Sequence, residues 1–188
     1  MIGLVGKARC GKSSVAKVLV DEYGYHILPM AGAIRKAILL AIPFLKANYL
    51  NEDKEETIPE LGVTGRQLLQ SMGHEWGRGN NEDIWIKTHK YEMDLMGIDH
   101  RKVVVDDVRY ANEMSYIKEL GGHIIGVDRP YMEGAETASW REHPSEAGVP
   151  ADMIDEWISN ISCLYVDLEC ATRNVMDRLL DPHHEAIQ

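Results

Sequence analysis

A short glycine-rich stretch near the start of the chain constrains the fold more strongly than any other feature. Residues 6–13, GKARCGKS, match the pattern G-x-x-x-x-G-K-[ST]. The apolar run at residues 2–5 predicts a buried strand, and the segment after the stretch has helical spacing of apolar residues that ends at Gly24. Because this pattern forms a phosphate-binding loop when it connects a strand to a helix, we interpret it as a nucleotide site rather than a chance match.

The residue types in this stretch suit the binding of an anion. Glycine lets the backbone bend and approach phosphate oxygens closely, and successive N–H groups at the start of a helix attract negative charge. The Lys12 ammonium can reach the β- and γ-phosphates of a nucleotide, and the Ser13 hydroxyl can ligate Mg²⁺. The residues of this stretch that we expect to bind ATP are Gly6, Arg9, Gly11, Lys12, Ser13 and Ser14.

Two carboxylates follow a second apolar run. Three valines at residues 103–105 predict a central parallel strand, and Asp106 and Asp107 come directly after it. One reading places a carboxylate at the metal ion, with Asp106 as the metal and substrate ligand and Asp107 as the catalytic group. The other makes one of them the N-cap of the helix that follows. Spacing alone leaves open which of the two lies nearer the metal.

The order of apolar segments predicts the fold class. Strands alternating with helices through short turns indicate an α/β fold with a doubly wound, mostly parallel sheet flanked by helices. Ligands of such sheets bind beyond the carboxyl ends of the strands, where the glycine-rich stretch and the two aspartates would both lie. We expect strands at 25–30, 102–105, 123–127 and 164–166, helices at 33–45, 64–76, 83–96, 110–120, 152–160 and 169–180, and a loop at 48–59.

Composition excludes several classes of protein. The 188 residues favour a single domain, and a formal net charge of -10 disfavours wrapping a nucleic acid polymer or binding an anionic membrane. Three cysteines without a C-x-x-C pair predict neither a disulfide framework nor a zinc site. The apolar start is interrupted by basic residues, so we expect no signal peptide and a cytoplasmic protein.

Arginines are the remaining charged groups that phosphoryl transfer would use. Positive side chains must converge where negative charge develops, and the candidates are Arg66, Arg78, Arg109, Arg129 and Arg141. Each of them taken alone is more often a surface arginine. The irregular segment 129–150, rich in Gly, Pro, Glu and Arg, is interpreted as a lid rather than an ordinary loop.

With these residues identified, the chain resembles the deoxynucleoside monophosphate kinases of bacteriophages, within the wider P-loop nucleoside monophosphate kinase group. The resemblance rests on four stretches that together span most of the chain, and the second and third are the most specific. They are GKARCGKS (6–13), TGRQLLQSMG with EWGR and DIW (64–85), VDDVRYANE with GG and VDRP (105–130), and HPSE with ISN (143–160).

This resemblance implies an ATP-dependent phosphotransferase with a P-loop NTPase-type fold. It would transfer the γ-phosphoryl group of ATP, with Mg²⁺, to a deoxynucleoside 5′-monophosphate. The implied domain covers residues 1–188, with an acceptor-binding helical region at 32–97 and the lid at 129–150. By analogy, the acceptor residues are Arg66, Gln70, Arg78, Trp85, Asp106, Arg109 and His143; the catalytic residues are Lys12, Asp107, Arg109 and Arg141; and Arg129 contacts ATP. Gly65 departs from the pattern, since we expect proline there, and this predicts a less rigid loop before Arg66.

Two other readings stay open. The chain could be a P-loop kinase of another small metabolite, such as a dephospho-coenzyme or a sugar acid, or a nucleotide-binding regulatory module without kinase turnover. The sequence lacks the N-K-x-D guanine signature expected of a GTP-dependent switch, and this disfavours the regulatory module. A nucleic-acid motor is disfavoured by length and acidity. The expected partners are therefore ATP and a small acceptor, and for a phage protein the location would be the host cytoplasm. Base preference and a homodimer are left open.

Overall fold

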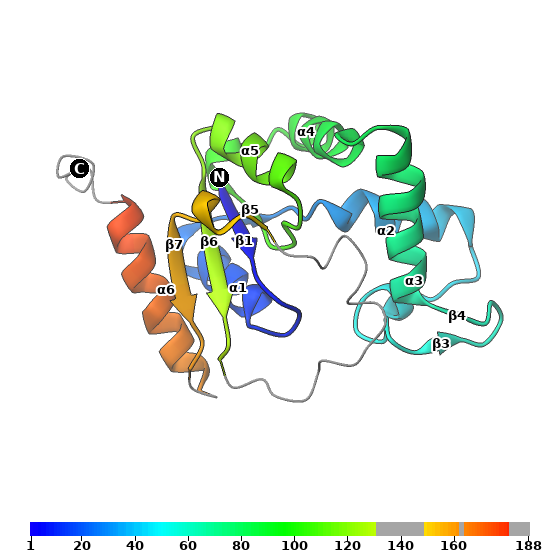
Figure 1. Ribbon diagram of the computed structural model, residues 1–188, viewed down its shortest axis with the longest axis horizontal. Coiled ribbons are helices and arrows are strands. Elements are labelled where there is room, and N and C mark those ends of the chain that lie inside the picture. Colours follow the sequence, from blue (N-terminus) through cyan, green and yellow to red (C-terminus); the bar gives the residue numbers. More distant parts are fainter. Residues whose placement is uncertain (131–148, 162–163, 181–188) are drawn as a thin grey trace. The chain divides into compact units, whose positions relative to one another are not determined.

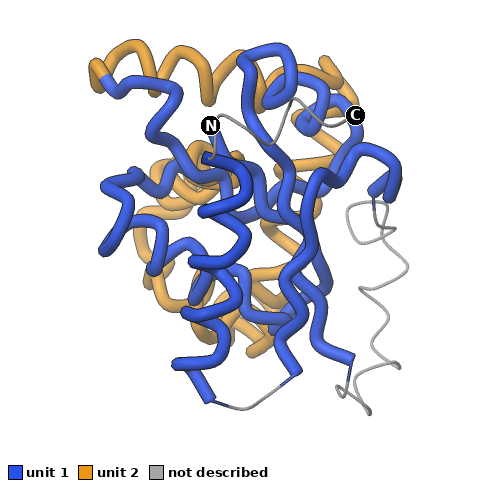
Figure 2. The backbone as a smooth tube through the Cα atoms, turned by 90° about the vertical axis from the view of Figure 1, so that its left-hand side faces the viewer, with its two compact units in different colours: residues 1–28, 98–136, 148–188 blue, residues 29–97, 137–147 orange. Residues whose placement is uncertain are grey.

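The computed structural model describes residues 1–130, 149–161 and 164–180, and the chain divides into two compact units (Figure 2). The first unit combines residues Met1–Leu28 with the described parts of Ile98–Glu136 and Gly148–Gln188. The described part of the second unit is residues Pro29–Gly97. The predicted single kinase domain stays a prediction, and each unit is described by itself.

The first unit is built on a five-stranded sheet in the order β2-β5-β1-β6-β7 (Figure 1). All four neighbouring pairs run parallel; the central strand β1, for example, has Gly3 level with Val105 of β5 and with Ile124 of β6. This arrangement confirms the predicted doubly wound, mostly parallel sheet. The strands are β1 (Ile2–Val5), β2 (His26–Ile27), β5 (Val103–Val105), β6 (His123–Asp128) and β7 (Glu156–Ser159).

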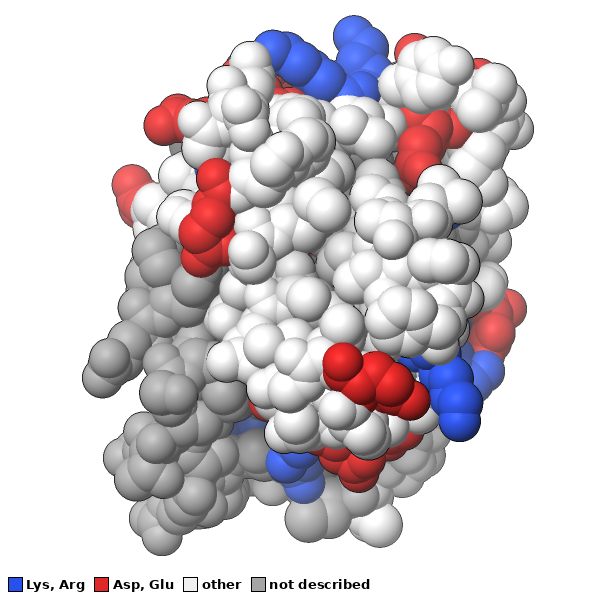
Figure 3. Space-filling model, turned by 90° about the vertical axis from the view of Figure 1, so that its right-hand side faces the viewer, with Lys and Arg blue, Asp and Glu red and all other residues white. Residues whose placement is uncertain are grey.

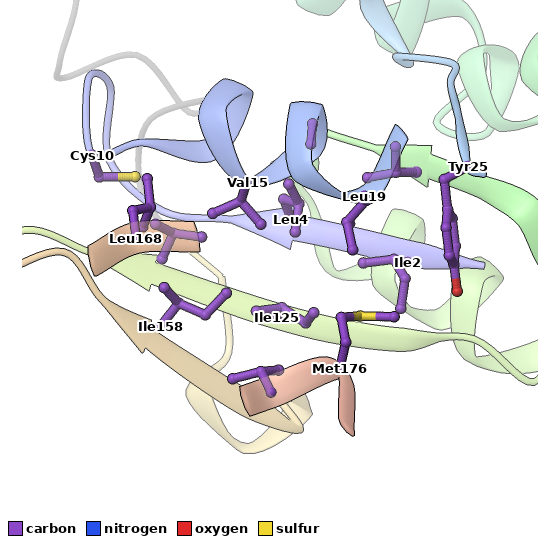
Figure 4. Packing of buried hydrophobic residues seen from close by; sticks show 14 residues of the cluster. Ile2, Leu4, Cys10, Val15, Leu19, Tyr25, Ile125, Ile158, Leu168 and Met176 are labelled. Carbon is purple, nitrogen blue, oxygen red and sulfur yellow. The ribbon is translucent and has the colours of Figure 1, made fainter. Parts of the chain in front are cut away.

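Helices cover both faces of this sheet. On one face, α1 (Lys12–Tyr23) and α6 (Tyr165–Leu180) bury a cluster that contains Leu4, Ile125 and Ile158 (Figure 4). On the other face, α5 (Ala111–Glu119) packs so closely that a Cβ on Gly3 would lie 2.7 Å from Cδ1 of Ile117. Alternate residues of β1 thus face opposite layers, as the two-residue period of a strand requires. Short 3₁₀ turns precede β5 (His100–Lys102) and β7 (Ala151–Met153).

The second unit contains helices and one small hairpin. Helix α2 (Ala31–Ala41), a 3₁₀ turn (Ala47–Leu50), α3 (Gly65–Gln70) and α4 (Ile84–Met96) pack around buried Ile38, Leu50 and Trp85. Helix α3 continues as a π-helix, η2 (Ser71–Arg78), and the hairpin pairs β3 (Thr57–Ile58) with β4 (Val63–Thr64). Among the described helices of the whole chain, none is both long and apolar enough to cross a membrane.

Three expectations about local structure are wrong. Residues 152–160 were expected to be helical, but β7 lies there, because pairing with the buried strand β6 overrides the local pattern. Residues 164–166 belong largely to the start of α6 rather than to a last strand. The expected loop at 48–59 includes a 3₁₀ turn and strand β3, whose Ile58 is buried against the helices of its unit.

Candidate functional site

The backbone between β1 and α1 has the shape that the glycine-rich stretch predicts. Gly6 has a φ of 142° and Gly11 a φ of 118°, and between them Arg9 adopts a φ of 64°. Residues with a Cβ rarely adopt such φ values, so the path of the loop requires glycine at positions 6 and 11. Their positions also exclude side chains by crowding, because a Cβ on Gly6 would lie 2.2 Å from the Val127 carbonyl oxygen of β6.

The start of helix α1 is suited to hold an anion. Gly11 is its N-cap, and the Gly11 carbonyl accepts hydrogen bonds from the backbone of Ser14 and Val15, each at 3.0 Å. Within the described residues, this N-terminus has neither a side-chain cap nor an acidic residue in its first turn. The positive end of the helix dipole and its N–H groups are therefore directed at the loop, and no acidic side chain of the first turn offsets them.

Lys12 folds back over the loop that precedes it. Its Nζ donates to the carbonyl oxygens of Gly6 at 2.7 Å and Lys7 at 2.9 Å, and lies 3.8 Å from Sγ of Cys10. The ammonium is thus held at the loop by backbone carbonyls, which phosphate oxygens can replace as hydrogen-bond acceptors. Beside it, the Ser13 hydroxyl belongs to an exposed residue, and Ser14 is half-buried.

The two predicted carboxylates lie where strand β5 ends. Strands β1, β5 and β6 are adjacent and parallel, so Asp106 and Asp107 share the edge of the sheet from which residues 6–11 emerge. The N-cap of the following helix α5 is Tyr110, with Glu113 as its N3 partner, so neither aspartate caps that helix. This finding removes the structural alternative that the sequence left open and leaves both carboxylates half-buried at the edge.

A buried carboxylate holds the turn that carries Arg109. Glu113, only 4 % exposed, accepts a hydrogen bond from the Arg109 backbone N–H at 2.8 Å and one from the Tyr110 N–H at 3.2 Å. These contacts fix the backbone just after Asp106 and Asp107. Glu113 was not singled out from the sequence, although a glutamate three residues after a helix start is a recognisable capping signal.

Two further residues lie beyond the ends of β6 and β7. Arg129, predicted to contact ATP, is half-buried and follows the last residue of β6 directly. Asn160 follows β7, and its Nδ2 donates to the Cys10 carbonyl oxygen in the loop at 2.9 Å. No role was assigned to Asn160 from the sequence, because nothing local signals a contact with a residue 150 positions away.

In the second unit, Arg66 is held by a carboxylate. Arg66 is 6 % exposed, its Nε donates to Oε1 of Glu55 at 2.7 Å, and its Nη2 lies 2.5 Å from the same oxygen. The Arg66 backbone N–H also donates to the Lys54 carbonyl at 2.8 Å. A charged, buried and oriented arginine of this kind suits recognition of a phosphate, and Glu55 is a partner that sequence reasoning did not find.

Gly65 is explained by close packing rather than by a need for flexibility. It is the first residue of α3, where a Cβ would lie 1.5 Å from the carbonyl oxygen of Tyr49. The helix start is further fixed by a capping box, in which the Gln67 N–H donates to Oγ1 of Thr64 and the Thr64 N–H donates to Oε1 of Gln67. The segment before Arg66 is thus anchored by its neighbours, although the proline expected from the resemblance is absent.

The other predicted acceptor residues lie along α3, η2 and α4. Gln70 is four residues after Arg66 and so shares its helix face, whereas Arg78 ends the π-helix. Trp85 is 6 % exposed, and its Nε1 donates to the Gly73 carbonyl at 2.7 Å. Its contribution is therefore to packing, and its predicted position near the acceptor stays a prediction. Arg141 and His143 lie outside the described residues, as does most of the predicted lid.

The residues around the glycine-rich loop fit ATP and Mg²⁺. The loop has the left-handed glycines, the uncapped helix start and the lysine that a polyphosphate requires. In the described ranges no three His, Cys, Asp or Glu side chains gather into a cluster that could hold a metal by itself. One serine hydroxyl and one carboxylate at the sheet edge do suit Mg²⁺, which takes few protein ligands and completes its shell with phosphate and water.

Charged side chains are dispersed over the face drawn in Figure 3. Lysine, arginine and acidic residues lie there in small separate groups with uncharged surface between them. The net charge of -10 therefore does not form one continuous acidic surface on the described part of this face.

Comparison with known proteins gives consistent matches. The family model for deoxynucleotide monophosphate kinases matches residues 50–167. The chain is 33 % identical over 159 residues to a putative deoxynucleotide monophosphate kinase of Acanthamoeba polyphaga mimivirus, covering 78 % of this chain and 80 % of that protein. It is 30 % identical over 150 residues to the deoxynucleoside-5′-monophosphate kinase of Escherichia phage T5, covering 74 % of this chain and 59 % of that protein.

A solved structure shares the fold. TT1252 from Thermus thermophilus matches with a TM-score of 0.53 at 19 % identity, over 96 % of this chain and 97 % of that one. The parallel sheet with a glycine-rich loop after β1 confirms the predicted P-loop NTPase-type fold class. The family model covers more than half of the chain, and the two curated relatives are 30 % or more identical to the chain over the matched residues. The chain therefore belongs to the deoxynucleotide monophosphate kinase family.

Proposed function

We propose that this protein transfers the γ-phosphoryl group of ATP to a deoxynucleoside 5′-monophosphate, giving the corresponding diphosphate and ADP. The observation that carries the proposal is the loop of residues 6–11, whose left-handed glycines and uncapped helix start form a site for a polyphosphate. Membership of the deoxynucleotide monophosphate kinase family supports the choice of acceptor.

The first unit would bind the phosphoryl donor. When ATP occupies the loop, the Lys12 ammonium exchanges the carbonyl oxygens of Gly6 and Lys7 for oxygens of the β- and γ-phosphates. Ser13 together with Asp106 or Asp107 would hold Mg²⁺, which would neutralise part of the phosphate charge. Arg109, with its backbone fixed by Glu113, would offer positive charge to the phosphoryl group in transfer.

The second unit would bind the acceptor. Arg66 is oriented by Glu55 and would bind the monophosphate, with Gln70 on the same helix face and Arg78 further along. An oxygen of the acceptor phosphate attacks the γ-phosphorus as the bond from that phosphorus to the β,γ-bridging oxygen breaks, and ADP leaves with that oxygen. A phosphate oxyanion is already nucleophilic, so the reaction needs positioning and positive charge more than a general base.

An acceptor panel tests this proposal. ADP release would be followed with ATP, Mg²⁺ and each common deoxynucleoside and ribonucleoside monophosphate in turn, and the diphosphate product would be identified by chromatography. We expect at least one deoxynucleotide to stimulate ADP release strongly with an equal amount of its diphosphate formed. An equally low rate with every nucleotide would contradict the assigned acceptor and would move the search to other small metabolites.

A further inference from the structure

Asn160 connects the last strand of the sheet to the glycine-rich loop. Its backbone N–H donates to the Asp128 carbonyl at 2.8 Å, which extends the pairing of β7 with β6 by one residue. Its side chain then leaves the strand, and Nδ2 donates to the Cys10 carbonyl oxygen at 2.9 Å. The backbone bond already completes the strand pairing, so the side-chain amide is used for the loop.

The same amide lies directly against Gly11. A Cβ on Gly11 would lie 2.9 Å from Nδ2 of Asn160 and 3.3 Å from Cδ2 of Leu168, a buried residue of α6. In Figure 4, Leu168 is drawn beside Cys10, whose sulfur points inward to the cluster. The turn from the loop into α1 therefore packs against two residues that follow it by about 150 positions or more, Asn160 and Leu168.

This contact controls which way an N–H group points. In a trans peptide the C=O of one residue and the N–H of the next point in opposite directions, and the described residues contain no cis peptide. When Asn160 holds the Cys10 carbonyl, the Gly11 N–H is consequently directed away from Asn160. Gly11 has a φ of 118°, an angle that glycine adopts without steric cost, so sterics alone leave the orientation of this peptide plane open and the Asn160 hydrogen bond restrains it.

We propose that Asn160 is a positioning residue for the phosphoryl donor: it holds the Cys10–Gly11 peptide in the orientation that presents the Gly11 N–H to phosphate. This inference rests on the proposed function, because it takes the loop to be the ATP site. Asn160 does not touch the reacting atoms. Its effect is to make the loop ready for phosphate before ATP arrives, which lowers the ordering cost of binding.

Two substitutions at this position separate the hydrogen bond from side-chain volume. Asn160→Ala removes the amide, and Asn160→Asp keeps its shape but places a carboxylate oxygen against the Cys10 carbonyl oxygen. Asn174→Ala, at an exposed position of α6, is the matched control. By calorimetric titration we expect the Kd for ADP to rise about tenfold with Asn160→Ala, as for one lost hydrogen bond, and at least as much with Asn160→Asp. The control should bind ADP like the wild type.

A merely structural role would not separate the two substrates. We expect the KM for ATP to rise in both Asn160 variants while the KM for the deoxynucleoside monophosphate stays within about twofold of the wild type. The Cys10 thiol, buried in the wild type, gives a second readout. Its alkylation rate, followed by peptide mapping, should increase severalfold in both Asn160 variants and stay unchanged in the control.

The outcomes distinguish this inference from the proposed function. If the wild type binds neither ADP nor ATP, the proposed function fails. If the wild type turns over normally and both Asn160 variants match it in ADP affinity and in Cys10 alkylation, Asn160 does not position the loop. If both KM values rise together and the thermal midpoint falls, Asn160 has only a general structural role, and the inference is likewise overturned.

Discussion

At the scale of single residues, two cations of the candidate site have partners within their own unit. The ammonium of Lys12 is bound by two loop carbonyls, and the guanidinium of Arg66 by the carboxylate of Glu55. Arg109 is fixed through its backbone by Glu113. The side chains of Lys12 and Arg66 are therefore oriented in the protein without substrate, which reduces the entropy that binding must remove.

Replacing Lys12 tests the role of the loop. We expect Lys12→Ala to lower kcat by about a hundredfold or more, because a positioned positive charge at the transferring phosphoryl group is lost. The fold should persist, since the lost contacts are to carbonyls at the surface of the loop. Lys17→Ala, which removes an exposed lysine of the same helix, is the control. Steady-state kinetics measure kcat and circular dichroism measures folding for both variants. Normal turnover of Lys12→Ala would refute the site.

Replacing Arg66 tests the acceptor site. We expect Arg66→Ala to raise the KM for the monophosphate by about tenfold or more with a smaller change in kcat, because it removes binding common to ground and transition states. Lys36→Ala is the control, since it deletes an exposed cation of the same unit that pairs with Glu92. Initial rates over a range of acceptor concentrations give both constants. A change confined to the KM for ATP would contradict the assignment.

At the scale of elements, the start of α3 shows how packing replaces sequence signals. The backbone of Gly65 approaches the Tyr49 carbonyl so closely that no side chain fits, and the backbone N–H of Arg66 bonds to Lys54. The helix that carries Arg66 and Gln70 is therefore positioned by the segment just before the β3–β4 hairpin. A change at Gly65 should consequently affect the acceptor residues through the backbone.

Gly65→Ala is expected to lower the free energy of unfolding by about 2–4 kcal/mol, because the added Cβ would collide with backbone rather than with a movable side chain. Gly32→Ala in α2 is the matched control. Its Cβ would meet only ordinary contacts at 3.6 Å or more, so alanine should stabilise that helix by about 0.5–1 kcal/mol. Urea titration of both variants measures the difference, and equal stabilities would show that the Tyr49 contact is relaxed in solution.

The elements also show what the sequence could and could not predict. Strand β1, the loop and helix α1 follow from a local pattern, and the Val103–Val105 run identified β5 together with its two carboxylates. Strand β7 was missed because a short edge strand takes its conformation from β6, and only Ile158 of its four residues is fully buried. Glu55 and Asn160 were missed because their contacts join positions that are distant in sequence or carry no motif.

At the scale of the whole molecule, each of the two units has its own kind of hydrophobic core. The first relies on a parallel sheet buried between helices, and an ion pair between Glu22 of α1 and Arg173 of α6 closes one layer. The second relies on helix packing around Trp85, whose ring fills the space beside Gly77. The pH dependence of the stability of the first unit should therefore include a contribution from the Glu22–Arg173 ion pair between α1 and α6.

The hydrogen bonds from Arg173 lower the pKa of Glu22 below its ordinary value of 4.5. Because the folded-state pKa is depressed, the pair stabilises the protein above the unfolded pKa, and this contribution is lost as pH falls through the lower folded value. We expect Glu22→Gln to melt slightly below the wild type from pH 7 down to about 5, with the gap closing in more acidic solution. Thermal melts across this range measure the gap, and a gap that widens in acid would reverse the assigned sign.

The order of segments along the chain has a consequence for how the protein is made. Residues 6–11 are the first residues of the candidate site to be synthesised. Their conformation nevertheless depends on Val127 and Asn160, which follow more than a hundred residues later. The described part of the second unit, by contrast, is one continuous stretch. On the ribosome, that stretch can begin to fold while the phosphate loop still lacks the strands that shape it. A nascent chain that stops before β7 would thus carry the complete glycine-rich motif without Asn160, one of the residues that shape it.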